Sequence, residues 1–209
     1  MKTGIFGGTF NPVHNGHISL CRQCAEHCGF DRVLLIPTNL PPHKAAQHLA
    51  SNEDRLEMLR LAIQGCRGME VSDVEYRLGG RSYTVETLAR LKKMYPEDEF
   101  SLIMGSDMLR SFPNWYRAED ILAMATLTAG ARFPEEYEQL LEVRDSFGAM
   151  ASRIEVVKIQ VFEISSTRVR EICAGGEDAS SYLPAGVWDY IRKKDLYGFK
   201  REKERNIRQ

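Results

Sequence analysis

The stretch GGTFNPVHNGH, residues 7–17, decides the fold class of this chain and marks its first candidate site. It follows an apolar run that predicts a strand over residues 3–7, and it leads into a predicted helix over residues 15–29. A glycine pair at a strand exit lets backbone N–H groups approach a ligand closely, and the free N–H groups at a helix start favour an anion. Because His14 and His17 lie at this helix start, the stretch predicts a phosphate site that carries two imidazoles.

Two better-known phosphate-binding motifs are absent from the sequence. The glycines near the first strand do not have the G-x-G-x-x-G spacing of a dinucleotide site, and no G-x-x-x-x-G-K-[ST] P-loop occurs. His14 and His17 supply only two metal ligands, with no obvious third ligand nearby. Donors to the oxygens of a nucleoside triphosphate are therefore the better interpretation of the two histidines.

The remainder of the chain alternates between strand-like and helical patterns. Strands are predicted over residues 3–7, 32–36, 70–76, 100–104 and 125–131 and within 156–164. Helices are predicted over residues 15–29, 52–65, 82–95, 117–124, 134–147, 166–174 and 187–194. This order predicts an α/β fold with a doubly wound, mainly parallel sheet and helices on both faces. Ligands of such sheets bind at the carboxyl ends of the strands, where we expect segments 7–17, 37–44, 105–116, 131–133 and 164–170.

Length and composition limit the class of protein. The 209 residues suit one domain over residues 1–198, followed by a basic, solvated tail over residues 199–209. The 28 basic and 29 acidic residues nearly cancel, which argues against a nucleic-acid partner. No apolar run is long enough to span a membrane, and no signal-peptide pattern precedes the first strand, so we expect a cytoplasmic protein.

The five cysteines, an odd number at uneven spacing, argue against a disulfide scaffold. Cys21, Cys24 and Cys28 share one face of the first predicted helix, with His27 beside them, so a zinc site is one interpretation. We favour a buried helix face of small apolar side chains, because free cysteine is among the most buried residue types.

A second candidate site is ISSTRVR, residues 164–170, at the start of a predicted helix. Hydroxyl groups in this position cap the first turn of the helix and can also hold phosphate. Arg170 lies one turn after Thr167, so its guanidinium can reach the same anion. The loop PPHK, residues 41–44, adds Lys44, whose compact charge also suits phosphate.

Two further segments follow the strand predicted at 100–104. Asp107, in the string Gly105-Ser106-Asp107, can accept a hydrogen bond from a ribose hydroxyl, and an ordinary helix cap is the alternative. The loop FPNWY, residues 112–116, holds three aromatic rings that can stack on a flat heterocycle or pack against the core.

The motifs H-x-G-H at residues 14–17 and SSTxxR at residues 165–170 resemble the signatures of nucleotidyltransferases related to class I aminoacyl-tRNA synthetases. The resemblance covers nearly the whole chain and is closest to the bacterial nicotinate-nucleotide adenylyltransferases. It rests on GGTFNPVHNGH at 7–17, PPHK at 41–44, SYTVETL at 82–88, GSD at 105–107, NWYR at 114–117, ISSTRVR at 164–170 and VWDYIRKKDLY at 187–197. It implies a Rossmann-like nucleotidyltransferase fold and an enzyme that joins ATP to nicotinate mononucleotide, giving deamido-NAD and pyrophosphate, with Mg2+ accompanying the ATP.

The resemblance also implies roles for individual residues. The catalytic groups would be His14, His17, Lys44 and Arg170. The ATP-binding residues would be Gly7, Gly8, Thr9, Phe10, Gly16, Gly105, Asp107, Ile164, Ser165, Ser166 and Thr167. The mononucleotide-binding residues would be Thr84, Trp115, Tyr116 and Arg132. Arg132 is the weakest match, because the family often has Arg-Pro-Gly where this chain has Arg-Phe-Pro, and no protein ligand for a metal is expected.

Several alternatives stay open at this point. The acceptor could instead be nicotinamide mononucleotide, phosphopantetheine or glycerol phosphate, and the residues alone do not decide between a ring carboxylate and a ring amide. A non-catalytic nucleotide sensor on the same fold would bind ATP without releasing pyrophosphate. A zinc or thiol regulator built on the helix cysteines is less favoured, and so is a synthetase-like RNA enzyme, since the chain is short and has no basic surplus. The sequence does not indicate the oligomeric state.

Overall fold

One parallel sheet organises the part of the chain that the computed structural model describes, residues 1–40 and 49–199. Its strands are β1 (Lys2–Gly8), β2 (Arg32–Pro37), β3 (Met69–Val71), β4 (Glu99–Gly105), β5 (Ala125–Ala131) and β6 (Ile154–Lys158). Every neighbouring pair is parallel, in the order β3-β2-β1-β4-β5-β6. The prediction of a doubly wound, mainly parallel sheet is confirmed. Lys44 and the tail after Phe199 lie outside the described residues.

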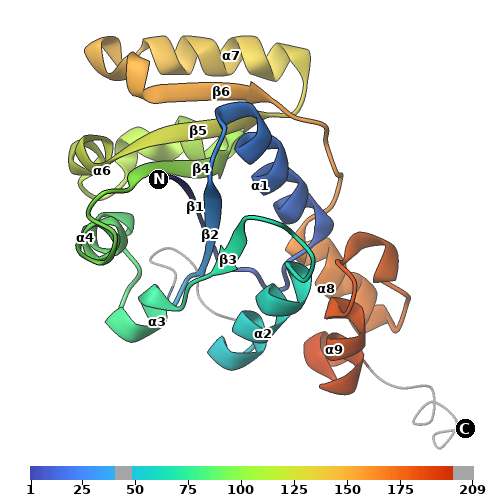
Figure 1. The fold of residues 1–209 in the computed structure, drawn as a ribbon. Coiled ribbons are helices and arrows are strands. Elements are labelled where there is room, and N and C mark those ends of the chain that lie inside the picture. Colours follow the sequence, from blue (N-terminus) through green and yellow to red (C-terminus); the bar gives the residue numbers. More distant parts are fainter. Residues whose placement is uncertain (41–48, 200–209) are drawn as a thin grey trace, which may run out of the picture.

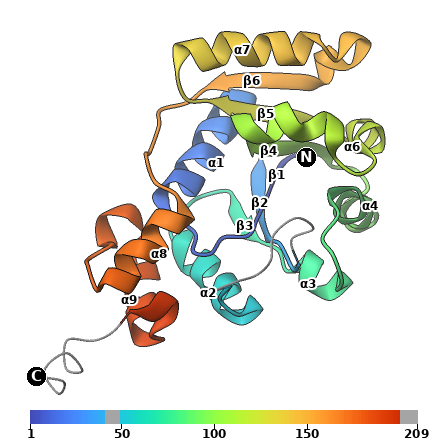
Figure 2. The ribbon, with the colours of Figure 1, turned by 180° about the vertical axis from the view of Figure 1, so that it is seen from behind.

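Seven of the described helices match helices that the sequence pattern predicts, and two short helices, at residues 74–78 and 106–111, were not predicted. The described helices are α1 (Asn15–Cys28), α2 (Asn52–Ala62), α3 (Val74–Leu78), α4 (Thr84–Met94), α5 (Ser106–Ser111), α6 (Ala118–Met124), α7 (Pro134–Asp145), α8 (Ser166–Gly175) and α9 (Val187–Lys193). Short 3-10 turns lie at Phe112–Asn114, Gly148–Arg153, Ser180–Tyr182 and Leu196–Gly198. In Figure 1, α1, α2, α8 and α9 lie on one side of the sheet, and α3, α4 and α6 lie on the other. Figure 2 shows the same division from behind.

Each face of the sheet has its own hydrophobic core. Adjacent residues of a strand point to opposite faces, so Ile5 packs with α3, α4, α5 and α6, whereas Phe6 packs with α1, α2, α8 and α9. The same alternation places Leu34 in the first core and Leu35 in the second. A sheet that is buried on both faces needs continuous apolar strands, as in the run from Val33 to Ile36.

Two predicted strands differ from the structure. The strand predicted over 70–76 is wrong beyond β3: only Met69 to Val71 pair with β2, and Val74 and Glu75 begin the helix α3. The strand predicted within 156–164 starts earlier, at Ile154, and ends at Lys158. It ends there because Lys158 pairs with the last residue of β5, and no partner strand continues beyond that point.

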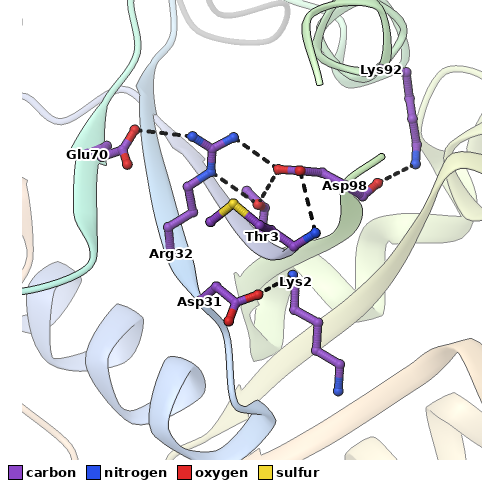
Figure 3. Close-up of polar contacts among 8 residues, drawn as sticks. Lys2, Thr3, Asp31, Arg32, Glu70, Lys92 and Asp98 are labelled. Atoms are coloured by element: carbon purple, nitrogen blue, oxygen red, sulfur yellow. Dashed lines mark hydrogen bonds and ion pairs between the residues drawn. The ribbon is translucent and has the colours of Figure 1, made fainter. Parts of the chain in front are cut away.

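The amino edge of the sheet carries a closed polar network (Figure 3). Asp98 accepts a hydrogen bond from Thr3 Oγ1 at 2.6 Å and pairs with Arg32 Nη2 at 3.0 Å. Arg32 also pairs with Glu70 at 3.3 Å, and Lys92 donates to the Asp98 carbonyl at 2.8 Å. Burial would raise the pKa of Asp98, but the hydrogen bonds from Thr3 and Arg32 hold that pKa below its ordinary value.

The cysteines of α1 serve the core. Cys21 and Cys24 are fully buried in the core that contains Phe6, as the favoured interpretation predicts, and Cys28 is half-buried near Thr128. All five cysteines are free thiols. Over residues 1–40 and 49–199, no three His, Cys, Asp or Glu side chains gather closely enough to hold a metal ion.

None of the helices described here combines the length and the apolar character that crossing a membrane requires.

Candidate functional site

A cleft of about 1020 Å³ opens at the carboxyl edge of the sheet, above the ends of β1, β4, β5 and β6. The strand order passes from β1 to β4 here, which is the topological switch point where ligands of such sheets bind. Most residues of the predicted ATP site line it: Gly8, Thr9, Phe10, His14, Gly16, His17, Asp107, Ile164, Ser165, Ser166, Thr167 and Arg170. Arg132, predicted for the mononucleotide, lines the same cleft. Gly7 and Gly105 are not among the lining residues.

The loop after β1 explains two of the glycines in the first motif. Phe10 is buried in the left-handed backbone region, at φ 48°, and its ring lies against Gly8. A Cβ at Gly8 would come within 3.0 Å of that ring, and a Cβ at Gly16 would come within 3.1 Å of the His14 ring. A Cβ at Gly7 would meet nothing within 4 Å, so packing alone does not require a glycine there. The packing of Phe10 and His14 therefore leaves little room for a side chain at positions 8 and 16.

The two histidines of the motif form a stacked pair at the start of α1. Their ring centroids lie 3.6 Å apart with 21° between the planes, and the Phe10 and His17 ring centroids lie 5.1 Å apart in a T-shaped arrangement. The backbone N–H of His14 donates to Nδ1 of His17 at 3.2 Å. An imidazole nitrogen that accepts a hydrogen bond carries no proton, so neutral His17 keeps its proton on Nε2 and presents it as a donor.

Burial keeps both imidazoles neutral. It lowers the pKa of His14 to about 4. Burial also lowers the pKa of His17 well below its ordinary value, and the neighbouring His14 lowers it further. Nδ1 of His14 is buried without a hydrogen-bond partner among the described residues. A buried polar atom left in this way has hydrogen-bonding capacity available for a ligand.

The start of α8 is tied to the loop after β1. Ser165 caps the helix by accepting from the backbone N–H of Arg168 at 3.1 Å, and Ser166 donates to the Pro12 carbonyl at 2.8 Å. Arg170 donates to the Asn11 carbonyl at 2.7 Å and to Thr167 Oγ1 at 3.2 Å, so its guanidinium lies beside the Thr167 hydroxyl. Residues from the starts of two helices, α1 and α8, thus line the same cleft, and the N–H groups at a helix start favour an anion.

The opposite wall of the cleft combines an ion pair with exposed apolar side chains. Asp107 accepts from Arg132 Nη2 at 3.1 Å, and the backbone N–H of Arg132 donates to Glu136 at 2.6 Å. Asp107 is the second residue of α5, so it is not the cap residue of that helix. Met108 and Phe133 line the cleft and are 46% and 51% exposed, which leaves apolar surface available for a flat, apolar group.

The other residues expected to bind the mononucleotide lie away from this cleft. Trp115 is partly buried against the core, its ring 5.3 Å from that of Phe112 and its Nε1–H donating to Ser111 at 3.4 Å. Tyr116 is 57% exposed, and its ring lies 4.8 Å from that of Tyr83, directly before Thr84 at the start of α4. The structure therefore brings segments 82–88 and 114–117 together, but not into the cleft that holds the histidines.

Arg55 is a functional candidate that the sequence analysis misses. It is completely buried on α2 and donates to the carbonyls of Thr9 and Thr38, at 2.9 and 2.6 Å. The signal was present in the sequence, because Arg55 occupies the first position of the buried helix stripe that continues with Met58 and Leu59. An arginine at an apolar position of a helix is usually hydrogen-bonded to buried acceptors.

Comparison with known proteins agrees with this geometry. Residues 5–172 match the cytidylyltransferase-like family. A relative from Gloeobacter violaceus is 40% identical over 202 residues (94% of this chain, 96% of the relative), and one from Listeria monocytogenes is 35% identical over 201 residues (95% and 98%). Both carry the name "Probable nicotinate-nucleotide adenylyltransferase".

Two solved structures share the fold at low identity. They are of nicotinic acid mononucleotide adenylyltransferase from Plasmodium falciparum, one complexed with NaAD and one with APC. Their TM-scores are 0.76 and 0.73 at 18% and 17% identity, covering 96% and 95% of this chain and 99% and 98% of theirs. With its full-length relatives, its family match and its cleft at the switch point, this chain belongs to the cytidylyltransferase-like family and, within it, to the nicotinate-nucleotide adenylyltransferases.

Proposed function

We propose that this chain transfers AMP from ATP to nicotinate mononucleotide, giving deamido-NAD and pyrophosphate. The observation that carries the proposal is the stacked, neutral pair His14 and His17 at the point where the starts of α1 and α8 face one cleft. The names and coverage of the curated relatives support the same reaction.

The proposed chemistry is a direct displacement at phosphorus. An oxygen of the acceptor phosphate forms a bond to the α-phosphorus of ATP, and the bond from that phosphorus to the bridging oxygen of the β-phosphate breaks. The electron pair leaves with pyrophosphate. The acceptor phosphate is already ionised at neutral pH, so the reaction needs no general base, and alignment and charge stabilisation remain as the tasks of the protein.

Neutral histidines suit these tasks. A ring held neutral by burial cannot act as a cation, but His17 can donate one directed hydrogen bond from Nε2 to an oxygen that gains charge in the transition state. The backbone N–H groups at the starts of α1 and α8 and the guanidinium of Arg170 add positive potential. We assign His14, His17 and Arg170 to the triphosphate of ATP, together with Lys44, which lies outside the described residues.

We propose that Mg2+ enters with ATP as the MgATP complex. Among the charged side chains that line the cleft, the arginines Arg132, Arg168 and Arg170 outnumber the carboxylates Asp107 and Glu163, which suits phosphate oxygens rather than a bare cation. Chelation with EDTA should stop pyrophosphate release, and added Mg2+ should restore it. Restoration by another divalent ion alone would replace Mg2+ in this proposal.

For the acceptor, we propose that Thr84, Trp115 and Tyr116 seat the nicotinate ring and that Arg132 contacts the acceptor from the ATP side. The contact between Tyr83 and Tyr116 supports a common pocket, because it joins the two segments that carry these residues.

The five free thiols fit a reducing compartment, and we place the protein in the cytoplasm.

The deciding experiment is pyrophosphate release with Mg2+ and ATP, comparing nicotinate mononucleotide with nicotinamide mononucleotide. A strong preference for the acid supports the proposal. Preference for the amide, or equal use of both, would keep the ATP site and overturn the acceptor. Release with neither acceptor, together with measurable ATP binding, would move the acceptor to phosphopantetheine or indicate a nucleotide sensor.

A further inference from the structure

The guanidinium of Arg55 joins the loops that follow two neighbouring strands. A single nitrogen, Nη1, donates to the Thr9 carbonyl after β1 and to the Thr38 carbonyl after β2. The other terminal nitrogen donates to the side-chain oxygen of Asn52 at 2.6 Å and reaches the Asn39 carbonyl at 3.5 Å. Strands β1 and β2 are paired in the sheet, with a backbone hydrogen bond from Thr38 to the Gly8 carbonyl at their ends, and Arg55 adds side-chain hydrogen bonds that join the two exit loops.

Stability alone is a weak reason for this arrangement. Arg55 is 0% exposed, and no carboxylate among the described residues lies within ion-pair distance of it. Burial lowers the pKa of Arg55, because the charged guanidinium loses its hydration. Hydrogen bonds to neutral carbonyls compensate for that loss only in part. An apolar side chain of similar size would often fill such a position without that cost.

The two carbonyls belong to the two halves of the proposed site. Thr9 lies in the cleft, directly before Phe10, whose ring contacts His17. On the other side, Asn39 follows Thr38, and its backbone N–H donates to Ser82 at 2.9 Å while its side chain donates to the Gly80 carbonyl at 2.9 Å. Residues 80–82 lead through Tyr83 into Thr84, a residue proposed to bind the mononucleotide. The loop that carries the Thr38 carbonyl is therefore joined to the acceptor segment.

A second buried group extends the same network into α4. Glu75 accepts from Thr87 Oγ1 at 2.9 Å and is 7% exposed. The ring of Tyr76 lies 5.5 Å from the Arg55 guanidinium. Ser82, which accepts from the backbone N–H of Asn39, also hydrogen-bonds to Glu75. The polar chain thus runs from the ATP-side loop through Arg55, Asn39 and Ser82 to Glu75 and the first turn of α4.

We propose that Arg55 is a positioning residue that sets the ATP-side loop, residues 8–11, relative to the acceptor-side segment, residues 38–40. This inference rests on the proposed function, because the two halves must be aligned for the acceptor phosphate to meet the α-phosphorus in line. A displacement of reacting groups by about 1 Å can lower the rate on the order of 10²-fold. Each half can still bind its own nucleotide when the alignment is lost.

The test compares Arg55→Met and Arg55→Lys with Arg60→Met, which changes an exposed arginine on the same helix. Thermal midpoints are measured first, and kinetics are then run at least 15 °C below the lowest midpoint. We expect kcat to fall on the order of 10²-fold for both Arg55 variants. The dissociation constant of MgATP should stay within about threefold of the wild-type value by calorimetry, since alignment rather than binding is lost. Lysine should not rescue kcat, because a point charge cannot reproduce the fork of a guanidinium. Arg60→Met should be unchanged.

Asn52→Ala provides a milder variant in case the Arg55 variants fail to fold. It removes one acceptor of Arg55 and should lower kcat by about threefold to tenfold at an unchanged MgATP dissociation constant, in line with losing one hydrogen bond. Equal kcat in all folded variants, or a loss confined to KM for ATP, would overturn the positioning role. The wild-type protein in the same assay reports separately on the proposed function, because its choice of acceptor does not depend on any variant.

Discussion

The two edges of the sheet differ in the charge and the hydrogen bonding of their buried polar groups. At the amino edge, Asp98 and Arg32 form a charged pair, and their network closes on itself (Figure 3). At the carboxyl edge, His14 and His17 are held neutral by burial, and Nδ1 of His14 has no partner among the described residues. A satisfied network adds stability, whereas unsatisfied polar groups in a cleft are available to a ligand. The comparison therefore assigns stability to the amino edge and chemistry to the carboxyl edge.

The largest expected effect is a loss of turnover caused by a substitution at the carboxyl edge. His17→Ala should lower kcat by roughly 10²- to 10⁴-fold, because it removes a donor directed at the transition state. Steady-state pyrophosphate release at saturating substrates is the measurement, with circular dichroism as the control for folding. Turnover within a few-fold of wild type would show that His17 has no such role.

Next in size is the pH dependence of stability that His14 contributes. Its pKa is about 4 in the folded protein against an ordinary value of 6.5, so between these values the unfolded chain binds more protons than the folded chain. The free energy of unfolding should therefore fall as the pH is lowered through this window, by about 3 kcal/mol in total. Urea titrations at pH 7, 6, 5 and 4 measure it, and His14→Gln should reduce the slope to the part that His17 contributes. An unchanged slope in that variant would contradict the assignment.

The amino edge should respond in a different pH window and in a different property. Asp98→Asn removes the charge that accepts from Thr3 and Arg32, and should lower the free energy of unfolding by about 2 kcal/mol. Because the pKa of Asp98 lies below its ordinary value of 3.8, its contribution is complete above that value and is lost as the pH falls further. Urea titration at pH 7 tests the first statement, and kcat should not change. A loss of kcat without a loss of stability would erase the distinction between the two edges.

The smallest expected effect distinguishes the proposed acceptor pocket from the ATP cleft, both at the carboxyl edge. Trp115→Ala should raise KM for the mononucleotide by about tenfold, the scale of one lost aromatic contact, and leave KM for ATP unchanged. The physical reason is that Trp115 lies outside the cleft that holds His14 and His17. Separate titrations of the two substrates measure this, with Phe133→Ala, a cleft residue, as the matched comparison. A change in KM for ATP instead would move Trp115 to the other pocket.

Local sequence patterns predicted the order of the strands and most element ends to within two residues, but they misplaced the ends of β3 and β6. The apolar run from Val33 to Ile36 is a strand on its own evidence, because a strand buried on both faces has no polar alternation. The end of β6 at Lys158 depends on where β5 stops, since a strand lasts only as long as its partner. Likewise, β3 covers only the three residues that pair with β2, Met69 to Val71.

The sequence by itself determined the class of the fold, the edge of the sheet where the candidate site lies, and most of the residues that line its cleft, because periodicity and short motifs such as H-x-G-H act over a few neighbouring residues. Tertiary structure alone decided that His14 and His17 are neutral, that Trp115 lies apart from them, and that Arg55 binds the carbonyls of two separate loops. These properties depend on burial and on contacts between residues distant in the chain. Desolvation and hydrogen-bond geometry exist only after the two cores have packed on the sheet.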